Sequence, residues 1–251
     1  MKKVILILER QSGEYLLNKF LSLEGWEIMC VLTSLNLDHK KKWWKGRLIK
    51  NICEENDIPV FSSDNDSILG YLKETFPKPD LSISVLNNIF VSKEFLTWAN
   101  FNSINIHGAP LPKYQGNNCT HFAILNEEKE FGVTAYRTSS EVDCGDILQK
   151  EIFEIKNGLT NYDLYQLTLK ATEVLINKII QKNFIFKKYE KFERKKSIFY
   201  KEMGVREITN ETSWKDIDKI SRAFYFPPFE PAYFIKDNQK VYVLPKFEVK
   251  S

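Results

Sequence analysis

An amide and an imidazole occupy alternate positions of one short apolar segment, residues 103–107. Because side chains alternate along a strand, Asn105 and His107 share one face while the neighbouring isoleucines share the other. The strand must end there, since Gly108 and the two prolines that follow cannot continue a hydrogen-bonded ladder. An amide donates and accepts hydrogen bonds, and an imidazole exchanges a proton near neutral pH. This placement favours a ligand site at a strand end, although a histidine that only hydrogen-bonds to the loop explains the same pattern.

A third candidate is Asp143, which lies in the run Asp143-Cys144-Gly145-Asp146. The glycine permits a tight turn between the extended segments 132–138 and 147–155, and alone such a loop is ordinary turn chemistry. A carboxylate beside an imidazole favours the protonated ring, or accepts a proton from a ligand directly or through water. Asp143 is therefore a candidate partner of His107.

The surrounding segments indicate how these residues are positioned. A continuous apolar run at residues 4–8 is typical of a strand buried on both faces of a parallel sheet, residues 81–85 give a further short strand, and helical segments alternate with the strands. We predict an α/β fold, a Rossmann-like and mainly parallel sheet with helices on both faces, plus a small C-terminal β-rich appendage. The composition changes after Asn183, so we predict a main domain over residues 1–183 and a connector with a small β-rich region over residues 184–251.

Several classes of cofactor are not expected. The turn after the first strand, residues 9–13, has one glycine where the dinucleotide fingerprint needs Gly-x-Gly-x-x-Gly, which argues against nicotinamide and flavin cofactors. Four scattered cysteines and three histidines in 251 residues show neither metal-ligand spacing nor a disulfide framework. We therefore expect no metal.

Charge and hydropathy limit the partners. A net charge of +3 is too small and too mixed in sign for a typical nucleic-acid binder. The basic cluster 39–45, with Trp43 and Trp44 among lysines, fits a solvated helix start, a nucleotide diphosphate site or a nucleic-acid-binding module. The apolar run at the N-terminus ends at Glu9, and no run reaches transmembrane length. We expect a cytoplasmic protein with neither a nucleic-acid nor a membrane partner.

Taken together, the motifs resemble the folate-dependent formyltransferases, which include methionyl-tRNA, glycinamide ribonucleotide and nucleotide-sugar N-formyltransferases. The family shows an Asn-x-His, a Leu-Pro-x-Tyr-x-Gly loop and a later Asp-x-Gly. Here these are Asn105 and His107, residues 111–116, and Asp143-Cys144-Gly145, which begins 36 positions after His107. The resemblance covers residues 1–155. Gln115 stands where the family commonly has arginine, which weakens the match to subfamilies that bind substrate through it.

This resemblance implies formyl transfer from N10-formyltetrahydrofolate to an amine, with residues 1–183 as the catalytic domain. The amine attacks the formyl carbon, a tetrahedral oxyanion forms, and a proton is lost. Asn105 and a protonated His107 can donate hydrogen bonds to the oxyanion, and either Asp143 or His107 can take the proton. The resemblance also implies that the pterin of the donor binds along Leu86, Asn87, Asn88, Ile89 and Phe90.

The resemblance to the nucleotide-sugar subfamily, carried by residues 116–126, favours a nucleotide-linked amino-deoxysugar as the acceptor. The most specific expectation is dTDP-4-amino-4,6-dideoxyglucose for O-antigen or another surface polysaccharide; methionyl-tRNA and the nucleic-acid-binding module are the alternatives. Candidate acceptor contacts are Gly108, Lys113, Tyr114, Asn117, Asn118 and Thr120. Helix capping explains the asparagines and Thr120 equally well. The aromatic stretch 224–234 fits a nucleobase stack, a pocket wall or a dimer contact, and we expect a homodimer.

Overall fold

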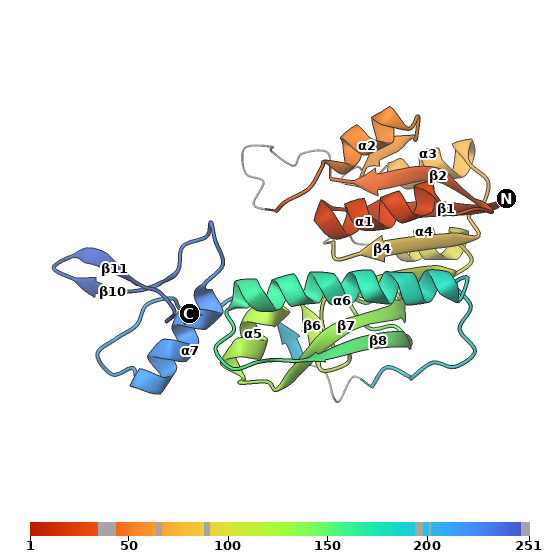
Figure 1. The fold of residues 1–251 in the computed structure, drawn as a ribbon. Helices are drawn as coiled ribbons and strands as arrows, with labels where there is room; N and C mark the ends of the chain where they lie inside the picture. Colours follow the sequence, from red (N-terminus) through yellow and green to blue (C-terminus); the bar gives the residue numbers. More distant parts are fainter. Residues whose placement is uncertain (35–43, 64–66, 88–90, 194–197, 201, 247–251) are drawn as a thin grey trace.

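The computed structural model describes residues 1–34, 44–63, 67–87, 91–193, 198–200 and 202–246, which form a layered α/β structure (Figure 1). Its centre is a seven-stranded sheet in the order β3-β2-β1-β4-β5-β7-β8. The parallel strands are β1 (Lys2–Leu8), β2 (Trp26–Thr33), β3 (Val60–Ser62), β4 (Leu81–Val85) and β5 (Ser103–His107). The antiparallel edge consists of β7 (Glu130–Arg137) and β8 (Ile147–Glu154). The predicted Rossmann-like, mainly parallel sheet is confirmed.

Helices cover both faces of this sheet, as predicted. One face carries α1 (Arg10–Leu21), α2 (Ile49–Glu55) and α6 (Asn161–Gln181). The other carries α3 (Ile68–Thr75) and α4 (Lys93–Trp98). All five residues of β4 are buried: its three apolar side chains enter the core that α1 and α6 cover, and Ser82 and Ser84 hydrogen-bond to side chains of β5. The ends of β1, β4 and β5 therefore stay fixed relative to one another.

The long helix α6 begins with a side-chain cap. Thr160 caps the helix by accepting a hydrogen bond from the Asp163 amide, and the Asp163 side chain accepts one from the Thr160 amide. This reciprocal capping box satisfies backbone groups that the first helical turn leaves unpaired. From there α6 runs along the sheet (Figure 1). Its N-terminal end contacts the C-terminal part of the chain, where the Tyr162 amide donates to the Tyr225 carbonyl at 3.1 Å.

A short pairing of distant segments was not predicted. β6 (Tyr114–Gly116) runs parallel to β9 (Ile198–Tyr200), and α5 (Cys119–Leu125) follows β6 at once. The Tyr114 ring stacks on the Tyr200 ring, and Phe122 stacks on the other side of Tyr200. The C-terminal connector is thereby attached to the loop that follows His107.

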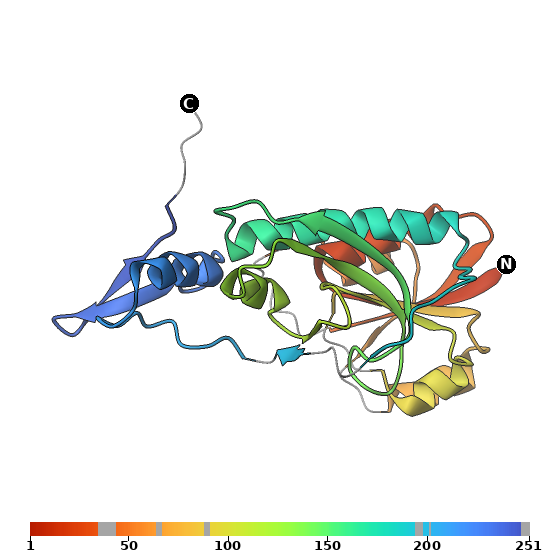
Figure 2. The ribbon, with the colours of Figure 1, turned by 90° about the horizontal axis from the view of Figure 1, so that it is seen from below.

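The C-terminal region contains a helix as well as the predicted hairpin. α7 (Trp214–Phe224) precedes the antiparallel pair β10 (Ala232–Lys236) and β11 (Gln239–Val243). The predicted small β-rich appendage is confirmed as this hairpin, and α7 was not predicted. Ile208, Phe224 and Ala232 form a small core of their own. Figures 1 and 2 show α7 beside α5 and the hairpin pointing away from the central sheet.

Among the helices of the described residues, none is long and apolar enough to cross a membrane.

Candidate active site

The proposed catalytic residues meet at the carboxyl end of β5. His107 is the last residue of β5, and its ring Nδ1 lies 3.5 Å from Asp143 Oδ1. The two side chains are only 12% and 8% exposed, so little water screens their interaction. On the other side of the ring, Nε2 lies 2.9 Å from the Tyr114 carbonyl oxygen. Both ring nitrogens thus face acceptor oxygens, an arrangement that suits a ring carrying two N–H groups.

Asn105 reaches Asp143 through a residue that sequence reasoning missed. The Asn105 Nδ2 group donates to the Tyr136 hydroxyl at 2.7 Å, and that hydroxyl donates to Asp143 Oδ1 at 3.0 Å. Ser84 Oγ donates to Asn105 Oδ1 at 2.7 Å, which fixes the orientation of the amide. Burial and the nearby Asp143 charge raise the pKa of Tyr136 well above its ordinary value, so the hydroxyl keeps its proton. The structure therefore joins Asn105 to Asp143 through two hydrogen bonds, and His107 lies 3.5 Å from the same carboxylate oxygen.

The Asp143 loop is held in place by backbone and amide donors. Asp143 has a φ of 52°, in the left-handed region that aspartate tolerates better than most residues. Its Oδ2 accepts from the Gly116 amide at 2.9 Å, and Gln115 Nε2 donates to the Asp143 carbonyl at 3.0 Å. At Gly145 a Cβ would lie 1.6 Å from the Arg137 carbonyl oxygen, so only glycine fits there. Gln115, at the position where the family commonly has arginine, thus serves to fix the acid.

The proline loop after His107 is fixed by one threonine of β7. Thr134 Oγ1 donates to the Ala109 carbonyl at 2.8 Å and accepts from the Leu111 amide at 3.0 Å. A buried hydroxyl that bonds both ways replaces the ladder that the prolines cannot make. The path of the chain from β5 to β6 is thereby defined.

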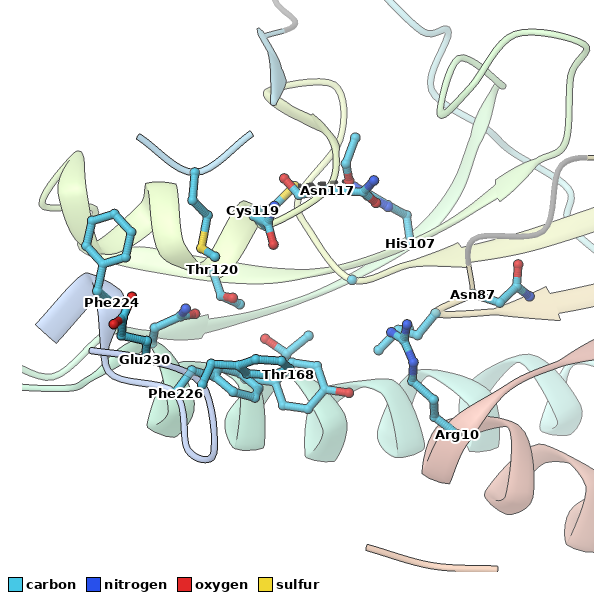
Figure 3. Close-up of a pocket in the computed structure, with 18 of the residues that line it drawn as sticks. Arg10, Asn87, His107, Asn117, Cys119, Thr120, Thr168, Phe224, Phe226 and Glu230 are labelled. Atoms are coloured by element: carbon cyan, nitrogen blue, oxygen red, sulfur yellow. Dashed lines mark hydrogen bonds between the residues drawn. The ribbon is translucent and has the colours of Figure 1, made fainter. Parts of the chain in front are cut away.

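A pocket of about 550 Å³ opens beside His107 (Figure 3). His107 lines it, whereas Asn105 and Asp143 are not among its lining residues and lie behind the imidazole. Cys119 also lines the pocket, with Sγ 3.9 Å from His107 Nε2. Burial raises the pKa of this thiol to about 12, so it stays protonated and is a poor nucleophile. His107 is the member of the predicted triad that a ligand in the pocket can touch.

The predicted donor segment is described in part. Leu86 and Asn87 follow β4 and line the pocket, and Asn87 Nδ2 donates to the Ile7 carbonyl at 2.8 Å. Asn88, Ile89 and Phe90 lie outside the described residues. The end of β4 therefore contributes to the same pocket as the end of β5.

The predicted acceptor contacts divide into two groups. Gly108, Asn117, Asn118 and Thr120 line the pocket. Lys113 and Tyr114 do not: both side chains contact Glu128, and the Tyr114 ring is buried in the stack with Tyr200. The structure brings the first four to His107 and places the other two in the supporting framework.

Side chains that sequence reasoning did not single out complete the pocket. Arg10 reaches it from the start of α1, and Arg206 from the connector before α7. Asn161, Tyr165 and Thr168 line it from α6. Phe224, Phe226 and Phe229 of the aromatic stretch 224–234, whose role the sequence left open, also line the pocket. Figure 3 shows Phe224 and Phe226 at the end away from His107. Within the described part of the chain, no cluster of three or more acidic, histidine or cysteine residues could hold a metal ion.

Comparisons with known proteins agree with this fold. The chain is similar to the crystal structure of WlaRD, a sugar 3N-formyl transferase in the presence of dTDP and 5-N-formyl-THF. The TM-score is 0.76 and the identity 26%, over 96% of this chain and 85% of that chain. The family model described as formyl transferase matches residues 47–180. The chain therefore belongs to the formyl transferase family.

Two curated relatives differ in how much of their length this chain matches. The chain is 28% identical over 175 residues to the GDP-perosamine N-formyltransferase of Brucella melitensis biotype 1, which covers 68% of this chain and 66% of that protein. It is 29% identical over 181 residues to the bifunctional polymyxin resistance protein ArnA of Wigglesworthia glossinidia brevipalpis, covering 71% of this chain and 27% of that protein. The chain thus matches about two thirds of one relative and about a quarter of the other.

Proposed function

We propose that this protein is an N-formyltransferase that moves a formyl group from N10-formyltetrahydrofolate to the amine of a nucleotide-linked amino-deoxysugar. The observation that carries the proposal is one continuous pocket with His107 and Arg10 at one end and Phe224, Phe226 and Arg206 toward the other. A reactive group at one end and a binding surface at the other suit a substrate with a reacting amine and a remote nucleotide.

The donor is assigned to the end of the pocket beside β4. Leu86 and Asn87 line the pocket there, next to His107, as the resemblance implied. The similar WlaRD structure was obtained with 5-N-formyl-THF, which supports a formyl-folate as the donor of this chain too. In this proposal the pterin lies along the segment after β4 and presents its formyl carbon to His107.

His107 acts directly on the reacting atoms. Its Nε2 N–H donates to the Tyr114 carbonyl in the free pocket, and turning toward the formyl oxygen stabilises the oxyanion of the tetrahedral intermediate. Asp143 Oδ1, buried and 3.5 Å from Nδ1, faces the opposite side of the ring. The attacking amine loses its proton to the His107–Asp143 pair or to water beside it. As the tetrahedral intermediate collapses, the bond between the formyl carbon and N10 breaks and N10 takes up a proton, so that tetrahydrofolate leaves.

The acceptor nucleotide is assigned to the rest of the pocket. Arg10 and Arg206 are the lining residues with a fixed positive charge among those described, and they suit a diphosphate. Phe224, Phe226 and Phe229 offer ring faces for a base. A dTDP sugar and a GDP sugar are named for proteins to which this chain is similar, which supports a nucleotide sugar as the acceptor class.

Finer parts of the proposal rest on the sequence alone. We retain dTDP-4-amino-4,6-dideoxyglucose as the acceptor, O-antigen or another surface polysaccharide as the destination, the cytoplasm as the site of action and a homodimer as the assembly. The division into a catalytic domain at residues 1–183 and a C-terminal region at 184–251 is also retained. Light scattering on the purified protein tests the homodimer, which a monomer mass contradicts.

Formylation of a panel of acceptors tests the function. Purified protein is incubated with N10-formyltetrahydrofolate and amino-sugar nucleotides that differ in base, sugar epimer and amine position. We expect a formyl mass gain on at least one nucleotide sugar and none on methionyl-tRNA. Efficient formylation of methionyl-tRNA, with no nucleotide sugar modified, would replace this proposal with its alternative.

A further inference from the structure

Three side chains of α6 form a stripe along the pocket. Asn161, Tyr165 and Thr168 are spaced four and three residues apart, so they share one helical face, and all three line the pocket. A Cβ added to Gly108 would lie 3.6 Å from Thr168, so the Thr168 end of the stripe adjoins His107. At about 1.5 Å per helical residue, Asn161 lies roughly 10 Å farther along the helix. Asn161 therefore marks the end of the pocket remote from the chemistry.

Aromatic rings surround this remote end. Phe226 contacts Tyr165 and Tyr162 edge-on, with ring centroids 5.3 Å and 5.5 Å apart, and Phe229 lies 5.9 Å from Phe226. Figure 3 shows Phe226 and Phe224 on the side of the pocket away from His107. Arg10 lies close enough to lower the pKa of Tyr165, which burial raises, so a cation adjoins the middle of the stripe. Figure 3 shows Arg10 on the same side of the pocket as His107, so the aromatic cluster lies at the opposite end.

The Asn161 amide has no function in the fold that its contacts reveal. The residue is only 5% exposed, and its Oδ1 atom is buried without a hydrogen-bond partner among the described residues. Capping, the usual reason for an asparagine at a helix start, is already performed by Thr160 and Asp163. Buried polar atoms are nearly always paired, and an unpaired one costs free energy. An amide of this kind at a pocket wall is suited to a ligand that completes its hydrogen bonds.

We propose that the Asn161 amide hydrogen-bonds to the nucleobase edge of the acceptor, so that it is the polar contact that holds the base among the aromatic rings. This inference rests on the proposed function. An amide presents one donor beside one acceptor, which complements the adjacent N–H and C=O groups of a pyrimidine imide or a guanine lactam. The terminal torsion of asparagine is broad, so rotation brings Oδ1 to a base N–H without moving the helix.

The test compares Asn161→Ala with Asn157→Ala, an exposed asparagine four residues upstream in the same segment. Calorimetry measures the binding of dTDP, UDP and GDP, and steady-state kinetics measure kcat and KM for the formylated nucleotide sugar. We expect Asn161→Ala to weaken the preferred diphosphate and raise KM by about 10- to 100-fold with kcat within about twofold, since one buried hydrogen-bond pair is lost. Asn157→Ala should match the wild type. Binding of 5-formyltetrahydrofolate and turnover of the sugar 1-phosphate should not change in either variant.

The outcomes separate this inference from the function on which it rests. If Asn161→Ala binds the diphosphate as tightly as the wild type, the Asn161 assignment is wrong while the formyltransferase proposal stands. An equal loss for the sugar 1-phosphate also overturns the assignment, because that ligand has no base. If the wild type neither binds a nucleoside diphosphate nor formylates a nucleotide sugar, the proposed function itself fails. Should the alanine variant unfold, Asn161→Asp is the second variant. Aspartate keeps the size of the side chain but cannot donate a hydrogen bond, so we expect the same loss of diphosphate binding.

Discussion

At the scale of single residues, Tyr136 explains how an amide on β5 and an acid in the loop after β7 are held as one unit. It lies directly opposite Asn105 in the β5–β7 register, and the turn after β7 brings Asp143 back over its hydroxyl. The hydroxyl bonds to both groups at once, so it fixes the position of the acid relative to the end of β5. Tyr136 is a positioning residue, because it acts through Asp143 and does not line the pocket.

Removing this hydroxyl should impair the chemistry more than substrate binding. In Tyr136→Phe the Asn105 amide and Asp143 Oδ1 each lose a partner, and we expect kcat to fall by about 10-fold with KM little changed. The free energy of unfolding should fall by about 1–3 kcal/mol, because two buried polar groups are left unsatisfied. Steady-state kinetics measure kcat and KM, and urea unfolding measures the free energy of unfolding. Tyr71→Phe, on an exposed ring, is the matched control, and an unchanged kcat in Tyr136→Phe would contradict the positioning role.

The catalytic assignment itself is tested by His107→Ala and Asp143→Asn. Asparagine tolerates the left-handed backbone of Asp143 and keeps an oxygen for the Gly116 amide, so the loop should persist without its charge. Because both residues are proposed to act mainly in the transition state, kcat should fall by at least about 100-fold in each variant. Asp146→Asn, in the same loop and paired with exposed Lys191, controls for the loop itself. Wild-type turnover of a true substrate by either variant would remove that residue from the mechanism.

Asn105, His107 and Asp143 could be anticipated from the sequence because each belongs to a motif with a fixed local geometry. A two-residue period puts the amide and the imidazole on one face, and a glycine turn presents the acid. Tyr136 and Arg10 carried no comparable pattern. Their positions depend on which strand pairs with β5 and on where α1 begins, and local spacing does not determine either.

At the scale of elements, β1 was the easiest strand to predict. Its residues 4–8 are a continuous apolar run, and no amphipathic helix gives that pattern. α7 was missed because it carries a polar face and follows an aromatic, lysine-rich connector without clear period. The β6–β9 pair joins segments more than 80 residues apart, and each has only three residues, so no sequence pattern marks it. Short elements formed by tertiary contacts lie beyond local prediction.

One buried histidine joins α5 to α7. His121 Nδ1 donates to the Ala223 carbonyl at 2.8 Å, its ring lies 4.5 Å from Phe224, and its Nε2 is buried without a partner among the described residues. Burial lowers the pKa of His121, with nearby Arg206 acting in the same direction. The ring is therefore neutral in the folded protein. It holds a helix whose last residue, Phe224, lines the pocket.

Acid should consequently loosen this junction. Above the ordinary histidine pKa of 6.5 the ring is neutral in both folded and unfolded chains and adds no pH dependence. As the pH falls below that value, His121 takes up a proton in the unfolded chain but not in the folded chain. The free energy of unfolding therefore falls by up to about 1.4 kcal/mol per pH unit. Urea unfolding of the wild type and His121→Asn at pH 7.5 and 5.5 measures the difference. Asparagine keeps an N–H donor without titrating, so an equal loss in both proteins would assign the acid sensitivity to other groups.

At the scale of the whole molecule, the pocket is assembled from segments far apart in the chain. His107 comes from the central sheet, Arg10 from the start of α1, and the aromatic residues from the loop between α7 and β10. The stacked rings of Tyr114, Tyr200 and Phe122 attach the C-terminal connector to the catalytic loop. The C-terminal region thereby supplies a wall of the pocket. Contacts between a ligand and that wall therefore influence which ligand is placed beside His107.

This arrangement predicts how the reaction depends on the remote part of the acceptor. A neutral amine must be held against the formyl carbon, and a small sugar alone offers few groups that the pocket can contact. Contacts of Arg10 and Arg206 with a diphosphate, and of Phe226 with a base, supply binding energy that positions the amine. We expect kcat/KM to rise in the order free amino sugar, sugar 1-phosphate, nucleotide sugar, by about 10³-fold or more over the series, because each added group engages a further section of the pocket. Side-by-side kinetics with the three compounds and one donor measure this. Equal kcat/KM values would show that the remote half of the pocket does not bind the acceptor, and the nucleotide-sugar assignment would then be wrong.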